Sequence, residues 1–205
     1  MPAARRRLRR RMRRRYPLTR SRWSQYNVLR TKCEYVTQLL YPADQAGQPY
    51  LNNTTGGNRS YISIPEMMAV YNRNTQLRSM FAYCMISGFK IEVTPHSNNV
   101  SAAGISNQSP VCLAMLPGTN GANAGLTFND LSVVNTGMVL DSTQRQSRYW
   151  SWRGGQFDMK LAADNDAIAA GTLLVRSVTN GVYTQSPSWN VRVTLYVVWR
   201  YAKLV

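Results

Sequence analysis

Residues 189–201 constrain the fold of this chain more than any other stretch. Every second residue from Trp189 onwards is apolar, and Asn190, Arg192, Thr194 and Arg200 stand at positions between them. A period of two over so many residues is the pattern of a β-strand with one face in a core and the other towards solvent or a subunit neighbour. The stretch therefore predicts a long strand and a sheet around it.

Other segments carry the same signal in weaker form. Phe81–Pro95 alternates apolar residues with Lys90 and Glu92, and Ser87-Gly88 predicts a bulge in its middle. The apolar residues expected on one face of this strand are Phe81, Tyr83, Met85, Phe89, Ile91 and Val93. Further strands are expected at residues 23–41, 61–64, 111–116, 138–140, 149–152 and 173–178, with a short helix at residues 65–77.

The chain therefore predicts an all-β protein with about eight strands, little helix and long polar loops. Short strands separated by loops rich in glycine and proline are typical of a two-sheet β-sandwich or a barrel. Residues 42–58 form one of the predicted loops. Loops of this length are uncommon in a compact monomer unless they have a function, so we expect them to contact other subunits or to shape an outer surface.

The sequence offers little support for catalysis. His96 is the one histidine, so a nucleophile–base pair has a single candidate base, and we interpret it as a solvated loop residue. Asp164 and Asp166 lack the further ligands of a calcium loop. Free buried thiols, without a disulfide or zinc site, are expected for Cys33, Cys84 and Cys112. We therefore expect no enzyme, no cofactor and no metal.

The first 22 residues are of a different kind from the rest. They hold arginine but no lysine, and the first acidic residue of the chain is Glu34. A block of like charges repels itself, buries almost nothing and stays disordered until it meets a polyanion, and guanidinium groups suit bidentate contact with phosphate. The expected nucleic-acid contacts are Arg5, Arg6, Arg7, Arg9, Arg10, Arg11, Arg13, Arg14, Arg15, Arg20 and Arg22.

We define residues 1–22 as the arm and residues 23–205 as the body. The chain has a net charge of +16, of which the arm supplies +11 and the body only +5. A nuclear localisation signal has the same composition as the arm and is compatible with nucleic-acid binding. A secretory signal would need an apolar segment after the charges, and a mitochondrial presequence would need an apolar face. Counterion release favours a nucleic-acid-binding arm.

Two places in the body extend this hypothesis. Arg30 and Lys32 lie just beyond the arm and are expected to continue its path along nucleic acid. A second cluster interleaves cations with aromatic rings, as single-stranded nucleic-acid surfaces do. Its members are Arg145, Arg148, Tyr149, Trp150, Trp152 and Arg153. The alternative, which we favour, is a strand whose aromatic residues fill the core while its arginines reach water.

The layout of the chain resembles the capsid proteins of small circular single-stranded DNA viruses, the circovirus-like group. The resemblance rests on the arginine-dense arm, the body of about eight strands and a closing strand, VRVTLYVVWR, at residues 191–200. The segment FKIEVTP at residues 89–95 is similar to a strand of that group that ends in proline after alternating basic and apolar residues. The resemblance implies an eight-stranded jelly-roll shell domain, built from two four-stranded sheets.

The resemblance also implies partners. Copies of the chain, about 60 in the smallest closed shell, would assemble with their arms turned inward onto single-stranded DNA. The arm would also engage a host nuclear import receptor, and the outer loops would bind a host-cell receptor during entry. The chain is then expected in the virion, and in the host nucleus during assembly. Two alternatives remain open: the capsid of a small RNA or satellite virus, and a cellular basic nucleic-acid-binding module.

Overall fold

The computed structural model describes residues 28–40, 49–53, 57–70, 72–96, 110–117, 125–141, 143–151, 160–161, 171–178 and 188–202. The arm, Trp152 and Arg153 lie outside these ranges. The strands are β1 (Val28–Leu40), β2 (Tyr50–Asn53), β3 (Gly57–Arg59), β4 (Tyr61–Ser63), β5 (Phe81–Pro95), β6 (Val111–Pro117), β7 (Met138–Val139), β8 (Gln146–Ser151), β9 (Lys160–Leu161), β10 (Gly171–Ser177) and β11 (Ser188–Ala202). The helices are α3 (Ile64–Ala69), α4 (Asn72–Met80) and α6 (Phe128–Val133).

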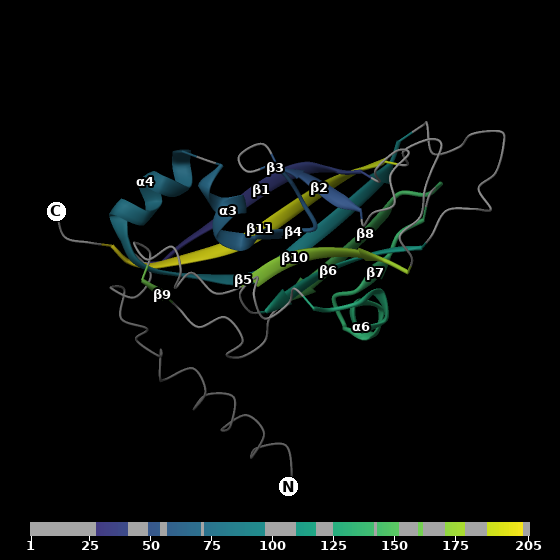
Figure 1. Ribbon diagram of the computed structural model, residues 1–205. Helices are drawn as coiled ribbons and strands as arrows, with labels where there is room; N and C mark the ends of the chain where they lie inside the picture. Colours follow the sequence, from purple (N-terminus) through teal and green to yellow (C-terminus); the bar gives the residue numbers. More distant parts are fainter. Residues whose placement is uncertain are drawn as a thin grey trace, which may run out of the picture.

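The strands form two antiparallel sheets. The first sheet has the order β3-β2-β1-β11-β5-β8, with β9 also paired to β5, and the second has the order β4-β10-β6-β7. Figure 1 shows β6, β7 and β10 in one layer below β1 and β11. Eight strands form the two four-stranded halves β1-β11-β5-β8 and β4-β10-β6-β7, and the chain crosses repeatedly between them. This arrangement is a jelly roll and confirms the predicted fold class.

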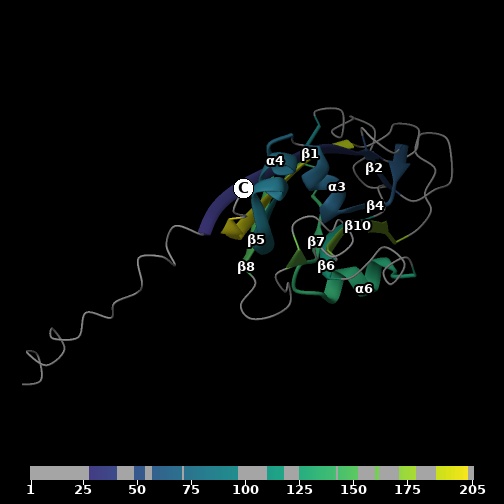
Figure 2. The same cartoon turned by 90° about the vertical axis from the view of Figure 1, so that its left-hand side faces the viewer.

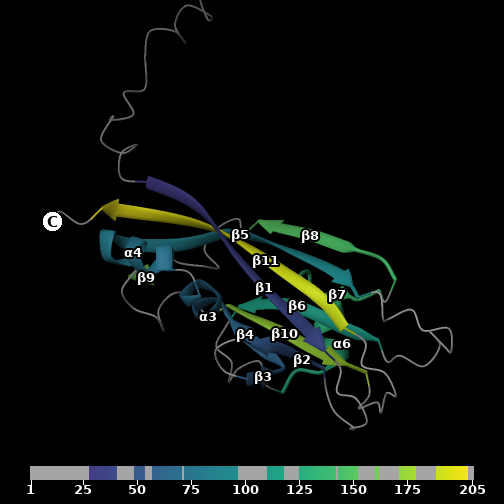
Figure 3. The ribbon, with the colours of Figure 1, turned by 90° about the horizontal axis from the view of Figure 1, so that it is seen from above.

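The closing strand, β11, lies between the two other long strands of the first sheet. It pairs with β1 from Val28↔Arg200 to Leu40↔Ser188 and with β5 on its other edge, as Figure 3 shows from above. Its odd-numbered residues from Trp189 to Trp199 are all buried, as the alternation predicts. A strand flanked on both edges satisfies its whole backbone within the sheet.

The predicted bulge in β5 is present, but it changes which residues face the core. The register with β11 shifts between Tyr196 and Val197, so that Gly88 and Ile86 become the successive partners and Ser87 is the extra residue. A bulge reverses the alternation of faces. Beyond it, Cys84 and Ile86 are buried at about 1% exposure. The expectation that Tyr83 and Met85 share the core face of Phe89 is therefore wrong.

Two further expectations are corrected. Residues 42–58, expected to be a loop, contribute β2 and most of β3, which extend the first sheet beyond the free edge of β1. The helix expected at residues 65–77 is two helices. Ser63 and Glu66 form a capping box that starts α3. The second helix follows because the buried Asn74 side chain donates hydrogen bonds to the Met68 carbonyl (3.0 Å) and to the Cys33 sulfur (3.1 Å).

The core lies between the sheets, and a smaller apolar cluster lies behind the second sheet. In this cluster Leu131 of α6 packs on Cys112, Ala114, Leu116 and Leu174. Figures 1 and 2 both show α6 on the side of β6 and β7 away from β1 and β11. Val111 to Leu116 are all buried, which confirms a strand covered on both faces. In the described ranges, no helix is long and apolar enough to cross a membrane.

Candidate nucleic-acid interface

The two sheets differ in what covers their outer faces. The second sheet carries α6 on its outer face, over the apolar residues just described. The outer face of the first sheet carries charged, polar and aromatic side chains, and none of the described helices packs on it. Val36 on β1 and Tyr149 on β8 are both 57% exposed. We call this outer surface of β1, β11, β5 and β8 the open face.

The strand register places residues of four strands in rows across the open face. One row contains Lys32, Tyr196, Gly88 and Ser151, and the next contains Glu34, Thr194, Lys90 and Tyr149. The basic residues on this face outnumber the acidic ones, Glu34 and Glu92. They are Arg30, Lys32, Lys90, Arg145, Arg192 and Arg200. Antiparallel pairing thus collects cations from segments far apart in the sequence onto one surface.

Glu92 is the centre of an ion-pair cluster on the open face. Its Oε1 lies 3.0 Å from Lys90 Nζ and 2.7 Å from Arg145 Nη2. Hydrogen bonds from Lys90 and then from Arg145 hold the pKa of the Glu92 carboxyl below its usual value. A pocket of about 300 Å³ opens beside this cluster, and the Arg192 side chain lines its other wall. Glu92 thus neutralises part of the charge at this end of the face.

Arg30, Arg192 and Arg200 are accessible to an external partner. Within the described ranges none of the three forms a salt bridge, and all three are exposed. Arg192 stands opposite Glu92 in the register of β11 with β5, whereas the register partners of Arg30 and Arg200 are not acidic. Exposed guanidinium groups of this kind are the groups that contact phosphate oxygens in nucleic-acid complexes. These arginines make the open face a candidate surface for a polyanion.

Two tyrosines lie at the middle of the open face. Tyr149 of β8 and Tyr196 of β11 meet edge to face, with ring centroids 5.4 Å apart and ring planes at 83°. Lys32 Nζ lies 5.8 Å from the centroid of the Tyr196 ring on the β1 side. Gly88 is the β5 partner of Tyr196, and a Cβ atom there would lie 3.1 Å from the hydroxyl oxygen of Tyr149, which comes from the next row. The absence of a side chain at Gly88 lets Tyr149 reach across β5.

The predicted site residues divide into three groups. The structure places Arg30 and Lys32 on the open face, next to β11. Arg148 and Trp150 point to the other side of β8, as described below. The arm, together with Trp152 and Arg153, lies outside the described residues, so their nucleic-acid contacts stay predictions.

Arg148 and Trp150 belong to a ladder of hydrogen bonds that links β8 to the segment containing β7. The bonds run from Gln146 Nε2 to the Val139 carbonyl oxygen (3.0 Å), from Arg148 Nη1 to that of Gly137 (3.1 Å) and from Trp150 Nε1 to that of Asn135 (2.6 Å). The Trp150 ring also stacks on buried Phe89, at 4.9 Å and 24°. These contacts favour the structural interpretation of both residues, and binding of nucleic acid by them stays a prediction.

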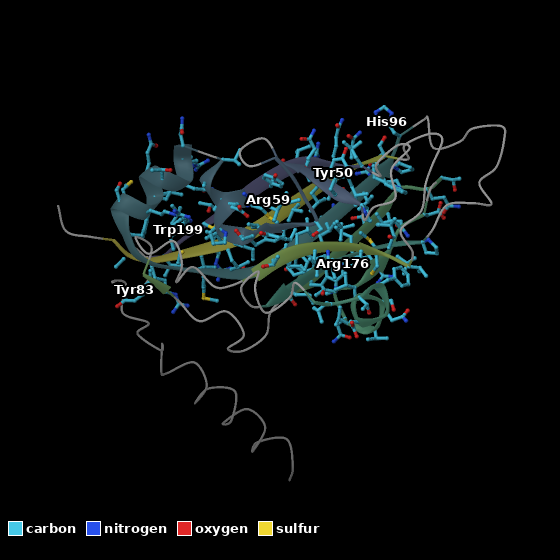
Figure 4. All side chains as sticks on the ribbon, in the orientation of Figure 1. Tyr50, Arg59, Tyr83, His96, Arg176 and Trp199 are labelled. Atoms are coloured by element: carbon cyan, nitrogen blue, oxygen red, sulfur yellow. The ribbon has the colours of Figure 1, made fainter. Side chains whose placement is uncertain are left out.

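Sequence reasoning missed part of the open face. The alternation puts Lys90, Arg192 and Arg200 at outward positions of predicted strands, but nothing in the sequence states that these strands are neighbours of β1. The sequence did contain one signal: basic residues occupy outward positions both on β1, which contains Arg30, and on β11. The one histidine, interpreted from the sequence as a solvated loop residue, also has ordinary surroundings. His96 is exposed at the end of β5, far from Arg176 and Trp199 (Figure 4).

The three thiols are buried and free, as expected. Burial raises the pKa of the Cys84 thiol to about 11 and also raises the pKa values of the Cys33 and Cys112 thiols. A thiol with a raised pKa is a poor nucleophile at neutral pH. Within the described ranges no cluster of histidine, cysteine and carboxylate side chains is suited to hold a metal ion.

The fold is similar to solved structures of viral capsid proteins. The BFDV capsid protein matches as a 60-mer with TM-score 0.54 and 10% identity over 87% of this chain and 97% of that one. It also matches as a decamer with TM-score 0.52 and 12% identity over 85% and 99%. The capsid protein of a T=1 subviral particle of Penaeus vannamei nodavirus, a deletion mutant, matches with TM-score 0.53 and 9% identity over 86% and 100%.

At these identities the similarity establishes the jelly-roll fold of the body. No family model matches the sequence, and no curated protein sequence matches it.

Proposed function

We propose that this chain is a viral capsid protein whose body assembles into a closed icosahedral shell, with the arm and the open face turned towards a packaged genome. One observation carries the proposal: the jelly roll keeps one sheet face open and basic, at the strand that continues directly from the arm. The arm precedes β1, and Arg30 and Lys32 lie on β1 itself. The arm is thus joined in sequence to the basic open face through β1.

The geometry supports assembly as well as binding. We expect neighbouring subunits to meet at the long segments between the strands. The BFDV capsid protein, which has this fold, forms decamers and 60-mers. Each arm alone binds nucleic acid weakly. In a closed shell many arms bind one polymer together, so their combined affinity for it is high. We therefore propose residues 1–22 as the packaging arm and residues 23–205 as the shell domain.

We further propose single-stranded DNA as the genome and a virus of the circovirus-like group as the source. The sequence resemblance favours this choice, and BFDV is a circovirus. A nodavirus capsid protein is similar to the same degree, which keeps an RNA genome as the second candidate. The same proposal includes two host partners. The arm would bind an import receptor that carries the protein into the host nucleus, and outer loops would bind a host-cell receptor.

The proposal is tested by expressing the full chain, treating the lysate with nuclease and examining the high-mass fraction by electron microscopy and absorbance at 260 and 280 nm. We expect round particles that hold nuclease-protected nucleic acid. A variant lacking residues 1–22 should form an ordered body but package none. A soluble monomer that only binds DNA would contradict the capsid proposal, and full nucleic-acid content in the truncated particle would contradict the role of the arm.

The kind of genome needs a separate experiment, because a recombinant shell packages what its host offers. Disassembled protein is reassembled with single-stranded DNA and RNA of the same sequence in equal amounts, and the protected fraction is digested with DNase or RNase. Preferential protection of DNA supports the circovirus-like assignment. Preferential protection of RNA moves the assignment to a small RNA or satellite virus.

A further inference from the structure

We propose that Tyr149 and Tyr196 form a stacking site for unpaired nucleotide bases at the centre of the open face. The body would then recognise single-stranded nucleic acid by contact with its bases, in addition to the charge contacts of the arm. This inference rests on the proposed function, since it names the ligand class of the open face. The proposed binding residues then include the two tyrosine rings and the arginines that flank them.

The first support is the position of the rings. Tyr149 is 57% exposed although it is a large aromatic side chain in a paired strand. Its neighbour in sequence, Trp150, points the other way and packs against the core. The exposed ring is therefore not needed to fill the sandwich. Its register partner on β5 is Lys90, and its hydroxyl reaches over Gly88, the β5 partner of Tyr196, where β5 has no side chain that would cover the rings.

The second support is the charge around the rings. Arg192 and Arg200 stand four residues before and after Tyr196 on β11, which places each about 13 Å from it along the strand. Lys32 lies beside the Tyr196 ring, and Arg30 is two residues further along β1. Tyr149 is exposed and Tyr196 is half-buried. Cations on both sides of such an aromatic pair are the arrangement that holds a phosphate backbone while bases rest on the rings.

The third support is chemical selectivity. A base in a duplex is stacked between its neighbours and offers no free face, whereas an unpaired base offers one to any aromatic ring. Base–ring stacking also tolerates every base, which suits a protein that must cover a whole genome. Charges alone, as in the arm, do not distinguish paired from unpaired strands by contact with bases. The tyrosine pair would supply that distinction.

The test compares two ligands that differ only in their bases: an oligothymidylate and an abasic oligomer of the same length. Both carry the same phosphates, so the arm contributes equally to each. Binding by the full chain is measured by fluorescence anisotropy at raised salt, where screening weakens phosphate contacts. We expect the wild-type chain to bind the oligothymidylate more tightly, by a factor of about five or more.

Two double variants then locate the preference. Tyr149→Leu with Tyr196→Leu removes both rings and should bring the two affinities to within a factor of about two. Tyr149→Phe with Tyr196→Phe keeps both rings and should retain the preference, which also shows that the sheet tolerates changes at these positions. A leucine variant that folds, as judged by circular dichroism, and still prefers the oligothymidylate would overturn the inference. Loss of the preference in the phenylalanine variant would overturn it too.

The outcome is separable from that of the capsid proposal. Particles that package nucleic acid normally, with no preference between the two oligomers, would remove the stacking site and leave the capsid function intact. A chain that never assembles, but whose preference for the oligothymidylate disappears when both tyrosine rings are removed, would contradict the capsid function and support the stacking site.

Discussion

At the scale of single residues, Gly88 is a position where the first sheet has no room for a side chain. A Cβ atom there would lie 2.6 Å from the carbonyl oxygen of Trp150, which belongs to the backbone of β8. Alanine normally gains up to about 1 kcal/mol over glycine inside a strand. The clash should outweigh this gain, so we expect Gly88→Ala to lower the free energy of unfolding by roughly 1–3 kcal/mol, measured by thermal or chemical denaturation.

Gly125→Ala is the matched control for this substitution. No atom lies within 4 Å of a Cβ built at Gly125, so the change in stability should stay within about 0.5 kcal/mol. Equal stability of the two variants would show that β8 can move away from β5 at no cost.

Glu92 gives the open face a dependence on pH. The Lys90 ammonium and the Arg145 guanidinium lower the pKa of its carboxyl in the folded state. Ionised Glu92 therefore stabilises the fold above its unfolded pKa near 4.5, and this contribution is lost as the pH falls through the lower folded pKa. We expect Glu92→Gln to melt at a lower temperature than wild type at neutral pH, with the gap closing in acid.

The comparison for Glu92 is Glu34→Gln, on the same face. Glu34 is exposed, and within the described ranges it forms no salt bridge. Its substitution should change the melting temperature little at either pH. A gap between Glu92→Gln and wild type that stayed constant from neutral to acid pH would mean that the carboxylate contributes nothing through its charge.

At the scale of elements, the ladder between β8 and the segment of β7 holds one side of the sandwich closed. Trp150 contributes twice, through its ring on Phe89 and through its N–H on the Asn135 carbonyl. Trp150→Phe keeps a ring and removes the donor, so the free energy of unfolding should fall by about 1 kcal/mol.

The control for the ladder is Tyr149→Phe, one residue away on the opposite face of β8. It also removes a single polar group, but one for which the structure shows no hydrogen bond to the ladder. Denaturation curves should show little change for it. A loss for Tyr149→Phe as large as that for Trp150→Phe would assign the effect to β8 as a whole and not to the hydrogen bond.

Strands could be predicted from the sequence where the conformation and burial of a residue are decided by the residues next to it in the chain. β1 and β11 alternate because each buries one face, so their buried positions and the extent of β11 could be predicted from the pattern. β5 could not be read in full, because the extra residue Ser87 moves Cys84 and Ile86 into the core in place of Tyr83 and Met85. The bulge is visible in sequence, but its effect on parity depends on the partner strand.

β2 was missed for a different reason. Its residues are polar or mixed, and it is a strand because the edge of β1 offers unpaired backbone groups, with Gln38 to Leu40 as its partners. The open face shows the same limit. Arg30 and Lys32 could be predicted from their nearness to the arm, whereas Arg192 and Arg200 joined them only through the pairing of the first long strand with the last.

At the scale of the whole molecule, charge is divided between the arm and the open face. Each phosphate contact with a single strand adds about 0.7 to the slope of log affinity against log salt. Arg192→Gln with Arg200→Gln should therefore reduce the slope of the full chain by about 1.4, and removal of the eleven arm arginines by up to about 8. Titration of a single-stranded oligonucleotide at several salt concentrations measures both.

Arg73→Gln is the control for the salt experiment. It removes the same charge from an exposed position on α4, away from the open face, and should leave the slope unchanged. If Arg73→Gln and the double variant altered the slope to the same extent per charge, binding would depend on total charge and not on the open face.

The pairing of β1 with β11 also decides when this protein can fold. Trp199 donates a hydrogen bond to the Thr31 hydroxyl across 168 positions of sequence, and the centre of the first sheet consists of such pairs. During synthesis β1 emerges long before β11, its partner, and contacts so distant in sequence form slowly. The polycationic arm precedes β1 and is exposed to cellular RNA throughout that delay. The arm of a nascent chain therefore meets cellular RNA, which competes with the genome, before the open face that would recognise unpaired bases has folded.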